Sequence, residues 1–512
     1  MPDAAPPDWI RDAVFYQIFP DRFASSSRVP KPGSLEPWDA PPTVHGFKGG
    51  DLLGIVERLD YLEALGINAI YLNPIFASAS NHRYHTYDYM AVDPLLGGDA
   101  ALRELLDAAH ARGMKVVLDG VFNHASRGFW PFHHVLEAGG ASPYRDWFYL
   151  NPKMLDAGQQ LRAYPSEVLS GALDPDWGAA HRLGDRSLDE LGYRAWWDLP
   201  ALPKLNVANP HMREYLLQVA EHWIRFGADG WRLDVAEEIG DAAFWAEFRH
   251  RVRTVNPEAY IVGEIWRLAP DWIGADRFDA VMNYPLAWRI LGFAAGRHLD
   301  LSVAAEQGHV RSVLHPLEAP AFGRQVEEVL AAYEPESLVA QLNMLDSHDT
   351  PRALTLCGGD ETSLRLCLLL MLSMPGAPSV YYGDEVGMAG HADPDSRRAF
   401  DWTEESWNLP LLDFVRRSIA VRQATPALRS AAVRMLACDG MAVVLARTDR
   451  ASTALVAVNA GESEAVVELG AGDLPSGAPV LLVGPSPTAV SASDGLRLTL
   501  PPRCGAIWST AA

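Results

Sequence analysis

The sequence contains little cysteine, with 4 residues in a chain of 512. None of the four has the spacing of a metal-ligand motif, and they are too few and too scattered for a disulfide framework. The pattern therefore excludes a disulfide-stabilised scaffold and a cysteine-ligated zinc site. We expect buried free thiols at these positions, Cys357, Cys367, Cys438 and Cys504.

Long hydrophobic runs are also absent. The apolar run at residues 366–374 is too short to cross a bilayer. Residues 1–11 contain neither the basic nor the apolar segment of a secretory signal. The sequence therefore predicts no membrane partner and a cytoplasmic location.

Positive charge is scarce, with 43 Lys and Arg against 65 Asp and Glu and a formal net charge of -22. Nucleic acids and anionic membranes attract basic proteins, so we expect neither as a partner and favour a neutral substrate. The composition is otherwise that of a globular protein, with 48% hydrophobic and 21% charged residues. The length suits a barrel with additional domains.

The stretch 226–238 places charged side chains inside an apolar run. Residues 231–236 predict a buried parallel strand, in which Arg232 and Asp234 are two residues apart and share one face. A buried charge is costly unless it is paired, so Arg232 can hold Asp234 ionised and aimed at a ligand above the sheet. On this segment alone, a structural Arg–Asp pair within the core is an equal alternative.

Three further apolar runs end in polar side chains at Asn123-His124, at Glu264 and at His348-Asp349. Segments of helical length separate the four runs. This arrangement is typical of a barrel of alternating strands and helices, whose active site lies at the carboxyl ends of the strands. We therefore predict an α/β fold with a (β/α)8 TIM barrel. The expected strands include 14–20, 67–74, 280–285 and 378–382, and the expected helices 51–65, 100–112, 211–226, 241–255 and 363–373.

These four regions resemble the characteristic regions of the α-amylase family of glycoside hydrolases. The segment LPKLN at 202–206 resembles a further region that marks the neopullulanase, cyclomaltodextrinase and maltogenic amylase branch. The segments QIFPDRF at 17–23, SHDTPR at 347–352 and YYGDE at 381–385 are similar to others in the family. The resemblance extends from about Trp9 to the C-terminus.

The resemblance also predicts the domain organisation. The barrel is expected at residues 1–123 and 204–427, interrupted by an inserted domain B at 124–203, where a Trp-rich stretch with little regularity begins after the third strand. Short alternating runs after about Arg429 predict a C-terminal antiparallel β-sandwich at 428–512. The first strand begins near Val14, so the N-terminal β-domain usual in this branch is not expected. The oligomeric state, monomer or homodimer, stays open.

Cleavage of a glycosidic bond with retention requires a nucleophilic carboxylate and a carboxylic acid roughly 5 Å apart. Adjacent barrel strands lie about 4.8 Å apart, so acids at neighbouring strand ends meet this condition. We predict Asp234 as the nucleophile, with its pKa lowered by Arg232. Glu264 is predicted as the general acid/base, protonated until substrate arrives, and Asp349 as the third carboxylate, which holds sugar hydroxyls.

The resemblance implies further substrate-binding residues. Tyr84 is expected as the aromatic platform under the sugar at the cleaved position, with His82 beside it. The other expected groups are His124 and His348 as hydrogen-bond donors to that sugar, Asp393 and Arg397 on its non-reducing side, and Glu238 and Trp266 on the leaving-group side. A surface salt bridge is the alternative for Asp393 and Arg397, and simple packing is the alternative for Trp266.

The resemblance implies a retaining hydrolase of α-1,4-glucosidic bonds in maltooligosaccharides, cyclodextrins, pullulan or starch. A transferase or isomerase that shares the glycosyl intermediate is the alternative, followed by a non-catalytic binding or chaperone homologue. No cofactor is expected to be required. Calcium is possible, with Asn123 as a contributor to a site between the barrel and domain B, and the histidines do not indicate zinc.

Overall fold

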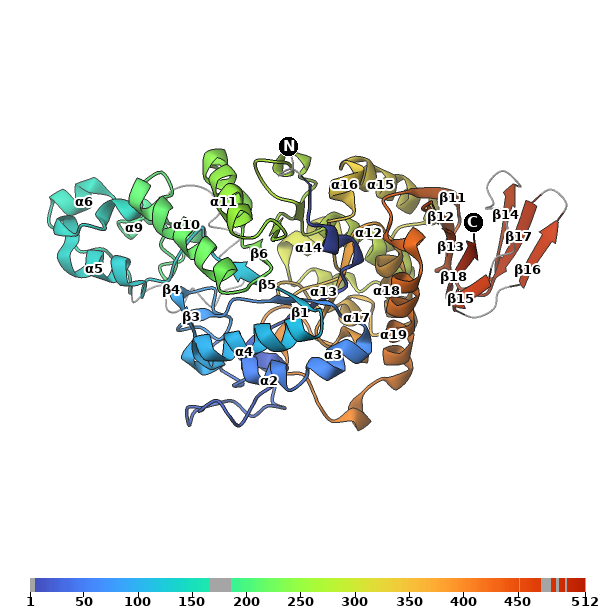
Figure 1. Cartoon of the computed structure of the whole chain (residues 1–512), viewed down its shortest axis with the longest axis horizontal. Coiled ribbons are helices and arrows are strands. Elements are labelled where there is room, and N and C mark those ends of the chain that lie inside the picture. The colour runs from blue at the N-terminus through green and yellow to red at the C-terminus, as the bar shows by residue number, and fades with distance from the viewer. Residues whose placement is uncertain are drawn as a thin grey trace.

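The computed structural model describes residues 5–165, 186–450, 452–470, 480–484, 488–492 and 495–511. A sheet of eight parallel strands lies at its centre, in the order β8-β7-β6-β5-β2-β1-β10-β9. A parallel bridge between Met282 and Leu342 joins the two ends, so the sheet closes into a barrel (Figure 1). The predicted TIM barrel is confirmed. Its strands are β1 (Phe15–Ile18), β2 (Ala69–Leu72), β5 (Lys115–Gly120), β6 (Gly230–Leu233), β7 (Tyr260–Gly263), β8 (Ala280–Val281), β9 (Leu342–Asn343) and β10 (Ala377–Tyr381).

Most of the barrel strands are shorter than predicted, and two of them are much shorter. The strands expected at 280–285 and near 343 form only two residues each, in β8 and β9. The chain leaves the sheet early because helix α12 (Tyr284–Ala295) begins directly after β8. Beyond β8, the side chain of Asn283 donates to the side chain of Asn343 at 2.8 Å. This side-chain contact links the two chain segments where the backbone pairing ends.

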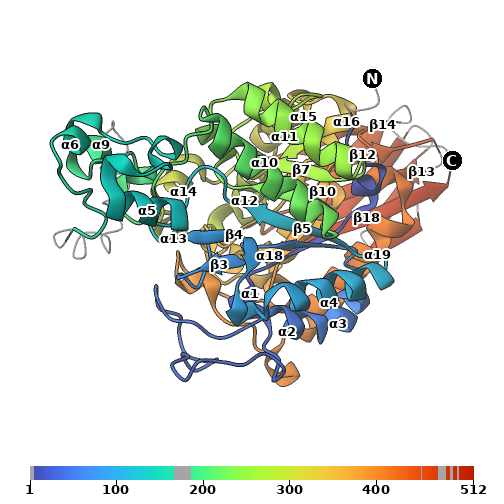
Figure 2. The same ribbon diagram turned by 60° about the vertical axis from the view of Figure 1, so that its left-hand side comes forward.

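Helices surround the barrel (Figure 2). Their positions agree with the predictions except at 51–65, where the single expected helix is wrong. The chain forms two short helices there, and Arg58 between them leaves the helical conformation and places its guanidinium 4.0 Å from the Trp402 ring centre. The main outer helices are α2 (Leu52–Val56), α3 (Leu59–Leu65), α4 (Gly98–Ala111), α10 (Pro210–Arg225), α11 (Ala242–Val255), α15 (Ala319–Ala331), α18 (Glu361–Ser373) and α19 (Leu409–Ala424).

Domain B follows β5, at the opposite end of the molecule from the C-terminal sheets (Figures 1 and 2). It contains α5 (Trp130–Ala138), α6 (Pro152–Asp156) and α9 (Arg186–Glu190). The chain returns to the barrel beside its point of departure, since Leu205 N–H donates to the Asn123 carbonyl at 3.0 Å. Residues 166–185, with Trp177 of the Trp-rich stretch, lie outside the described residues. The exact limits 124 and 203 stay predictions.

The hairpin of β3 (Phe76–Ser78) and β4 (Thr86–Val92), after β2, was not predicted from the sequence. Its buried Tyr89 donates to the carbonyl of His124 at 2.7 Å, which ties the loop after β2 to the loop after β5. The hairpin therefore supports the segment 82–85 that precedes β4.

The C-terminal region forms two antiparallel sheets with an apolar interior that includes Val444, Leu455, Leu498 and Trp508. The predicted β-sandwich is confirmed. One sheet contains β11 (Val433–Asp439), β12 (Ala442–Thr448), β13 (Ser452–Asn459), β15 (Val480–Val483) and β18 (Cys504–Ala511), and the other β14 (Ala465–Gly470), β16 (Thr488–Ala492) and β17 (Gly495–Leu500).

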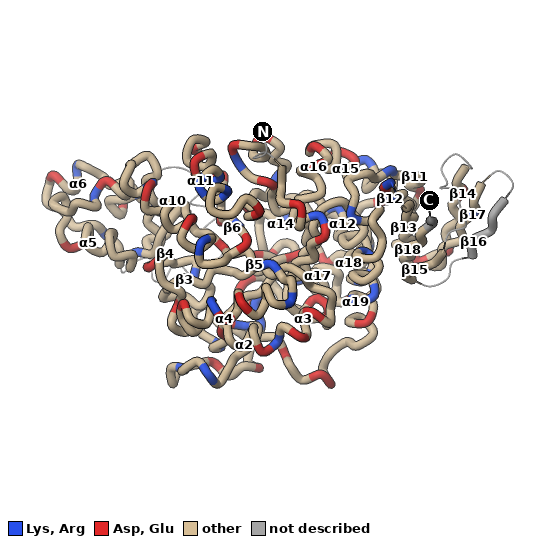
Figure 3. The backbone as a smooth tube through the Cα atoms, in the orientation of Figure 1, with Lys and Arg blue, Asp and Glu red and all other residues tan. Residues whose placement is uncertain are grey.

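Acidic residues are distributed across the barrel and domain B rather than gathered in one segment (Figure 3). All four cysteines are free; Cys357, Cys367 and Cys504 are buried and Cys438 is half-buried. Among the described residues, no helix combines the length and apolarity that crossing a bilayer requires.

Candidate active site

Asp234 and Glu264 lie side by side at the carboxyl ends of the fourth and fifth barrel strands. Leu233 of β6 pairs with Gly263 of β7, so the two acids directly follow paired residues. Neighbouring strands are about 4.8 Å apart. One guanidinium binds both acids, with Arg232 Nη1 3.0 Å from Asp234 Oδ1 and Nη2 3.0 Å from Glu264 Oε2. All three side chains are buried.

Asp119 of β5 is a third acid on the same guanidinium, and the sequence analysis did not identify it as a site residue. It pairs in register with Arg232, whose Nη1 lies 2.9 Å from its Oδ1. The hydroxyls of Tyr71 and Tyr84 donate to Asp119 Oδ2 at 2.7 and 2.8 Å. A signal was available, because a buried acid inside an apolar strand requires a partner, and Arg232 is the cation on the next strand.

Tyr84 and His348 form a stacked pair beside this cluster. Their ring centres are 5.2 Å apart with an angle of 2° between the planes. The Tyr84 hydroxyl contacts His348 Nε2 at 2.7 Å, and Asp349 Oδ2 lies 3.0 Å from the same nitrogen. The structure therefore brings Tyr84, His348 and Asp349 together, and links them to the acid cluster through Asp119.

The tautomer of His348 follows from its partners. The side-chain amides of Gln17 and Asn73 lie 3.0 and 3.1 Å from Nδ1, and an amide NH2 group can only donate. Nδ1 is thus the acceptor, and the proton of the neutral ring is on Nε2, the atom that faces Tyr84 and Asp349. Burial lowers the pKa of His348 well below its ordinary value, so the ring is neutral.

Arg397 and Asp393 form an ion pair at 3.0 Å, and Arg397 continues toward the site. Its Nη2 lies 3.3 Å from Asp349 Oδ1, and its Nε donates to the His348 carbonyl at 2.8 Å. Although 48% of the Asp393 side chain is exposed, the Arg397 side chain is only 10% exposed and also contacts Asp349, so the pair is more than a surface salt bridge. It connects the loop at 390–397 with the third carboxylate.

Trp266 contacts the predicted acid directly, since its Nε1 donates to Glu264 Oε1 at 2.9 Å. Its ring stacks on Tyr284 with 4.0 Å between the ring centres. Glu238 lies apart from this group, with an exposed side chain and a contact to Lys204 at 3.9 Å. The structure therefore joins Trp266, but not Glu238, to the acid cluster.

His82 and His124 lie on two flanks of the site, His124 as a buried ring and His82 as a half-buried one. His82 Nδ1 accepts from the Tyr84 backbone N–H at 3.1 Å, and burial lowers the pKa of His82 well below its ordinary value. His124 stacks on Trp196 with 4.8 Å between the ring centres, and burial lowers its pKa to about 3. Both rings are neutral at physiological pH.

The predicted pKa shift of Asp234 is wrong in direction. Burial, and then the negative charge of Glu264, raise the pKa of Asp234 well above its ordinary value, and Arg232 offsets only part of this. The same causes raise the pKa of Asp349 to about 7. Since the three buried acids and the half-buried Asp349 share few cations, the cluster holds a proton at neutral pH. The predicted lowering of the pKa rested on Arg232 alone, and it left out the burial of Asp234 and the charge of Glu264.

Val235 connects Asp234 to the next turn in a left-handed conformation, with φ 39° and ψ 47°. A β-branched residue in this region is strained, and such strain is concentrated at functional sites. The conformation aims Val235 N–H at Glu264 Oε2, at 2.9 Å. The strained turn thus fixes the acid relative to Asp234.

Calcium finds little support in the described residues. Asn123 Oδ1 is buried without a hydrogen-bond partner among them, as a metal ligand would be. However, calcium takes about six to eight oxygen ligands, and a single amide oxygen supplies one. No described group of three or more Asp, Glu, His and Cys side chains could hold a metal ion. The prediction that no cofactor is required therefore stays a prediction, and calcium dependence stays open.

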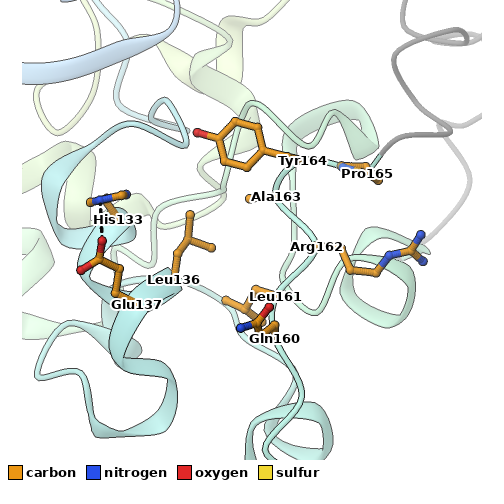
Figure 4. A pocket seen from close by; sticks show the side chains of 9 residues that line it. All are labelled: His133, Leu136, Glu137, Gln160, Leu161, Arg162, Ala163, Tyr164 and Pro165. Atoms are coloured by element: carbon orange, nitrogen blue, oxygen red, sulfur yellow. Dashed lines mark ion pairs between the residues drawn. The ribbon is translucent and has the colours of Figure 1, made fainter.

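A separate pocket of about 510 Å³ lies in domain B (Figure 4). Leu136 and Tyr164 point into it, and its acid Glu137 is ion-paired with His133 at 3.1 Å. Among the described residues, no second carboxylate lines it. The pocket therefore lacks the paired acids found at the barrel strand ends, which remain the candidate catalytic centre.

Comparison with known proteins identifies the family. The family described as "Alpha amylase, catalytic domain" matches residues 17–425, which include every barrel strand except part of β1. The chain belongs to the α-amylase family. It is thus a glycoside hydrolase, and the predicted family resemblance is confirmed.

Individual relatives cover most of the chain. A cyclomaltodextrinase of Geobacillus thermopakistaniensis is 41% identical over 467 residues, which are 90% of this chain and 71% of the relative. Neopullulanase 2 of Thermoactinomyces vulgaris is 39% identical over 468 residues, covering 90% of this chain and 72% of the relative. The native structure of the Nostoc punctiforme debranching enzyme aligns with a TM-score of 0.87 at 45% identity, over 99% of this chain and 100% of that chain.

Proposed function

We propose that the enzyme is a retaining α-glucan hydrolase that cleaves glucosidic bonds through a covalent glycosyl intermediate on Asp234. The observation that supports it most is the pair Asp234 and Glu264 on one guanidinium at adjacent strand ends. Their strand spacing of about 4.8 Å suits a nucleophile and an acid, and is too short for a water between them, as inversion requires.

In the first step, an Asp234 oxygen attacks the anomeric carbon while the bond to the leaving oxygen breaks. Glu264 gives its proton to that oxygen, so the leaving glucan departs as an alcohol. The Trp266 and Val235 N–H groups, which bind Glu264 in the free enzyme, stabilise its carboxylate once the proton has left.

In the second step, Glu264 takes a proton from water, whose oxygen attacks the anomeric carbon and releases Asp234. The product sugar keeps its original anomeric configuration. Asp349 and the protonated Nε2 of His348 are positioned to bind hydroxyls of the same sugar, with Tyr84 as its platform. These contacts can tighten as positive charge develops on the ring.

The proton held by the acid cluster supplies the acid for the first step. In the free enzyme it is shared among coupled carboxyls, with Asp234 and Asp349 both raised in pKa. When substrate binds, the sugar takes the place of the contacts that Asp234 and Asp349 make in the free enzyme. The proton that the cluster holds can then pass to Glu264. Ionised Asp234 then remains paired with Arg232 as the nucleophile.

The substrates we propose are maltooligosaccharides, cyclodextrins, pullulan or starch, cleaved at α-1,4 bonds. Relatives named cyclomaltodextrinase and neopullulanase support these classes. A second candidate is cleavage of branch points, because the Nostoc debranching enzyme aligns over 99% of the chain. We expect activity without any added cofactor.

The test is product analysis after incubation with β-cyclodextrin, pullulan, maltotriose and starch, with a branched maltodextrin as the fifth substrate. The Asp234→Asn and Glu264→Gln variants are compared with Glu405→Gln, a change at an exposed glutamate. We expect cleavage that both site variants abolish and the control retains, with or without a chelator. Wild-type enzyme inert on all five substrates would overturn the proposal, and preference for the branched substrate would favour the second candidate.

A further inference from the structure

The segment between α12 and α15 contacts two sides of the candidate site. It contains α13 (Leu301–Ala304) and α14 (Gly308–Val313), which are joined by a short turn. The Asp300 N–H donates to the Leu356 carbonyl at 2.8 Å, which anchors the start of the segment to α17 (Ala353–Leu356). The turn carries Glu306 and Gln307, and their side chains lead toward the site.

Glu306 binds the loop that contains Asp393 and Arg397. Its Oε1 lies 2.7 Å from Nδ1 of His391, and its Oε2 accepts from the Ala392 N–H at 3.0 Å. One carboxylate thus holds a ring and the adjacent peptide, immediately before Asp393. Because both oxygens of Glu306 are bound, the contact fixes the orientation of residues 391 and 392 as well as their distance from the turn.

Neighbouring residues of the turn contact the catalytic groups themselves. Gln307 Nε2 donates to the backbone carbonyl of Asp349 at 2.6 Å. The His309 ring lies edge-on against Trp266, with 5.0 Å between the ring centres. The segment therefore holds the loop at 390–397 at a fixed place relative to Asp349 and Trp266.

This contact contributes little to folding. The Glu306 and His391 side chains are 36% and 56% exposed, and ion pairs at such exposure add little to the free energy of unfolding. A contact that is weak for stability can still matter for binding, because a displaced loop misplaces Asp393 and Arg397 for the sugar.

We propose that Glu306 is a positioning residue for sugar binding on the non-reducing side of the cleaved bond. It acts through the 391–393 backbone and the Asp393–Arg397 pair, and it does not touch the reacting atoms. The inference rests on the proposed function. It predicts that loss of Glu306 weakens binding of glucans that extend beyond the cleaved sugar, and spares a substrate with one glucose unit.

The kinetic test compares Glu306→Ala and Glu306→Gln with Glu336→Ala. Glu336 is exposed on α16 (Pro335–Leu338) and has no ion pair among the described residues. For maltotetraose, Glu306→Ala should raise KM about fivefold to tenfold with kcat within about twofold. Glu306→Gln keeps acceptor and donor atoms for Ala392 and His391 and should restore most of the loss. KM for 4-nitrophenyl α-glucoside should not change in any of the three.

A double-mutant cycle with Asp393→Ala separates positioning from a general effect. If Glu306 acts through this loop, Glu306→Ala should raise KM no further in the Asp393→Ala background. Calorimetry of maltotetraose binding to Asp234→Asn, with and without Glu306→Ala, gives the same comparison without turnover. Three results would each overturn the inference. The first is a wild-type KM or affinity for maltotetraose in Glu306→Ala, and the second is an equal rise of KM for the aryl glucoside. The third is a rise of KM from Glu306→Ala that is just as large in the Asp393→Ala background.

These outcomes are distinct from failure of the proposed function. That failure would be a wild-type enzyme without glucan hydrolysis, whereas failure of this inference leaves an active enzyme that is insensitive to Glu306. The unfolding midpoint of each variant should stay within about 2 °C of the wild-type value, since the contact is exposed.

Discussion

Two buried charged clusters in this enzyme have opposite compositions. At the barrel strand ends, the acids Asp119, Asp234 and Glu264 surround the single guanidinium of Arg232. Where the barrel meets the C-terminal sheets, Arg422 and Arg447 are buried, and no ion pair to either is found among the described residues. The first cluster has too few cations for its acids, and the second has cations only.

The basic cluster is held by backbone carbonyls. Arg422 donates to four of them and Arg447 to three. Ser373 at the end of α18 accepts from Arg447, so the guanidinium meets the negative end of a helix. Burial lowers the pKa of Arg422 to about 9 and that of Arg447 well below its ordinary value.

The difference in composition between the two clusters corresponds to a difference in their expected roles. Carbonyl acceptors are fixed by the fold, so the basic cluster has one arrangement and serves to join two parts of the chain. The acids share a limited number of cations and a proton, so we expect their charge to change when substrate binds. Excess buried acid beside one guanidinium therefore indicates the proposed catalytic centre better than burial or charge alone.

The largest expected effect is on catalysis. Asp234→Asn and Glu264→Gln should each lower kcat/KM for maltotriose by at least about a thousandfold, because each removes a group that changes bonding in the transition state. The thermal unfolding midpoint of each variant should not fall, since each change relieves repulsion among the acids. The exposed Asp439→Asn serves as the control, and a tenfold loss or less in both site variants would contradict the assignment.

The basic cluster should show the reverse behaviour. Arg447→Met leaves three carbonyls without this donor and should lower the free energy of unfolding by about 3 kcal/mol, with kcat unchanged for the folded enzyme. Thermal melting measures the change, and Arg497→Met, at an exposed arginine on β17, controls for loss of charge. Unchanged melting would show that the guanidinium is not the link between the two parts.

A smaller effect is expected where the two stacked rings connect to the acids. Tyr84→Phe keeps the platform and removes the hydroxyl shared by Asp119 and His348. We expect kcat/KM to fall about tenfold to a hundredfold, in line with the loss of a buried hydrogen bond to a charged group. Tyr164→Phe, at an exposed ring, should be silent. Equal kinetics in the two variants would show that the hydroxyl has no role.

The smallest effect is on the pH dependence of stability. A carboxyl whose pKa rises on folding destabilises the native state above its unfolded pKa, and fully so above its folded pKa. For Asp349, with a folded pKa of about 7, the full shift would correspond to about 4 kcal/mol. Because its side chain is 29% exposed and solvent screens it, Asp349→Asn should raise the free energy of unfolding by only about 1 kcal/mol near pH 8. The gain should shrink toward about pH 4. Melting curves across this range check it, and a gain that grows toward low pH would contradict the raised pKa.

Several features could be predicted from the sequence alone because they depend on short segments. Asp234 and Glu264 each end an apolar strand, and parallel pairing brings such ends to one edge of the sheet. The proximity of His348, Asp349 and Tyr84 followed from the family resemblance rather than from any local pattern. The alternating runs after Arg429 were sufficient for the C-terminal sandwich.

Other features depend on contacts that no short segment encodes. The pKa of Asp234 reflects acids from several strands, so the Arg232–Asp234 spacing gave the wrong direction. Asp119 lies inside the run that ends at Asn123-His124, and its contact with the Arg232 guanidinium depends on the pairing of two strands. The role of Glu306 depends on a loop 85 residues later in the chain. Glu238 was placed by resemblance, and its side chain lies outside the cluster.

The central claim is that Asp234 is the nucleophile, and trapping tests it most directly. The Glu264→Gln variant is incubated with α-maltosyl fluoride, whose fluoride leaves without acid assistance, and the protein is then analysed by peptide mass spectrometry. Because the variant lacks the base for the second step, we predict one maltosyl group on the peptide that contains Asp234. No adduct, or an adduct on Asp349, would contradict the assignment.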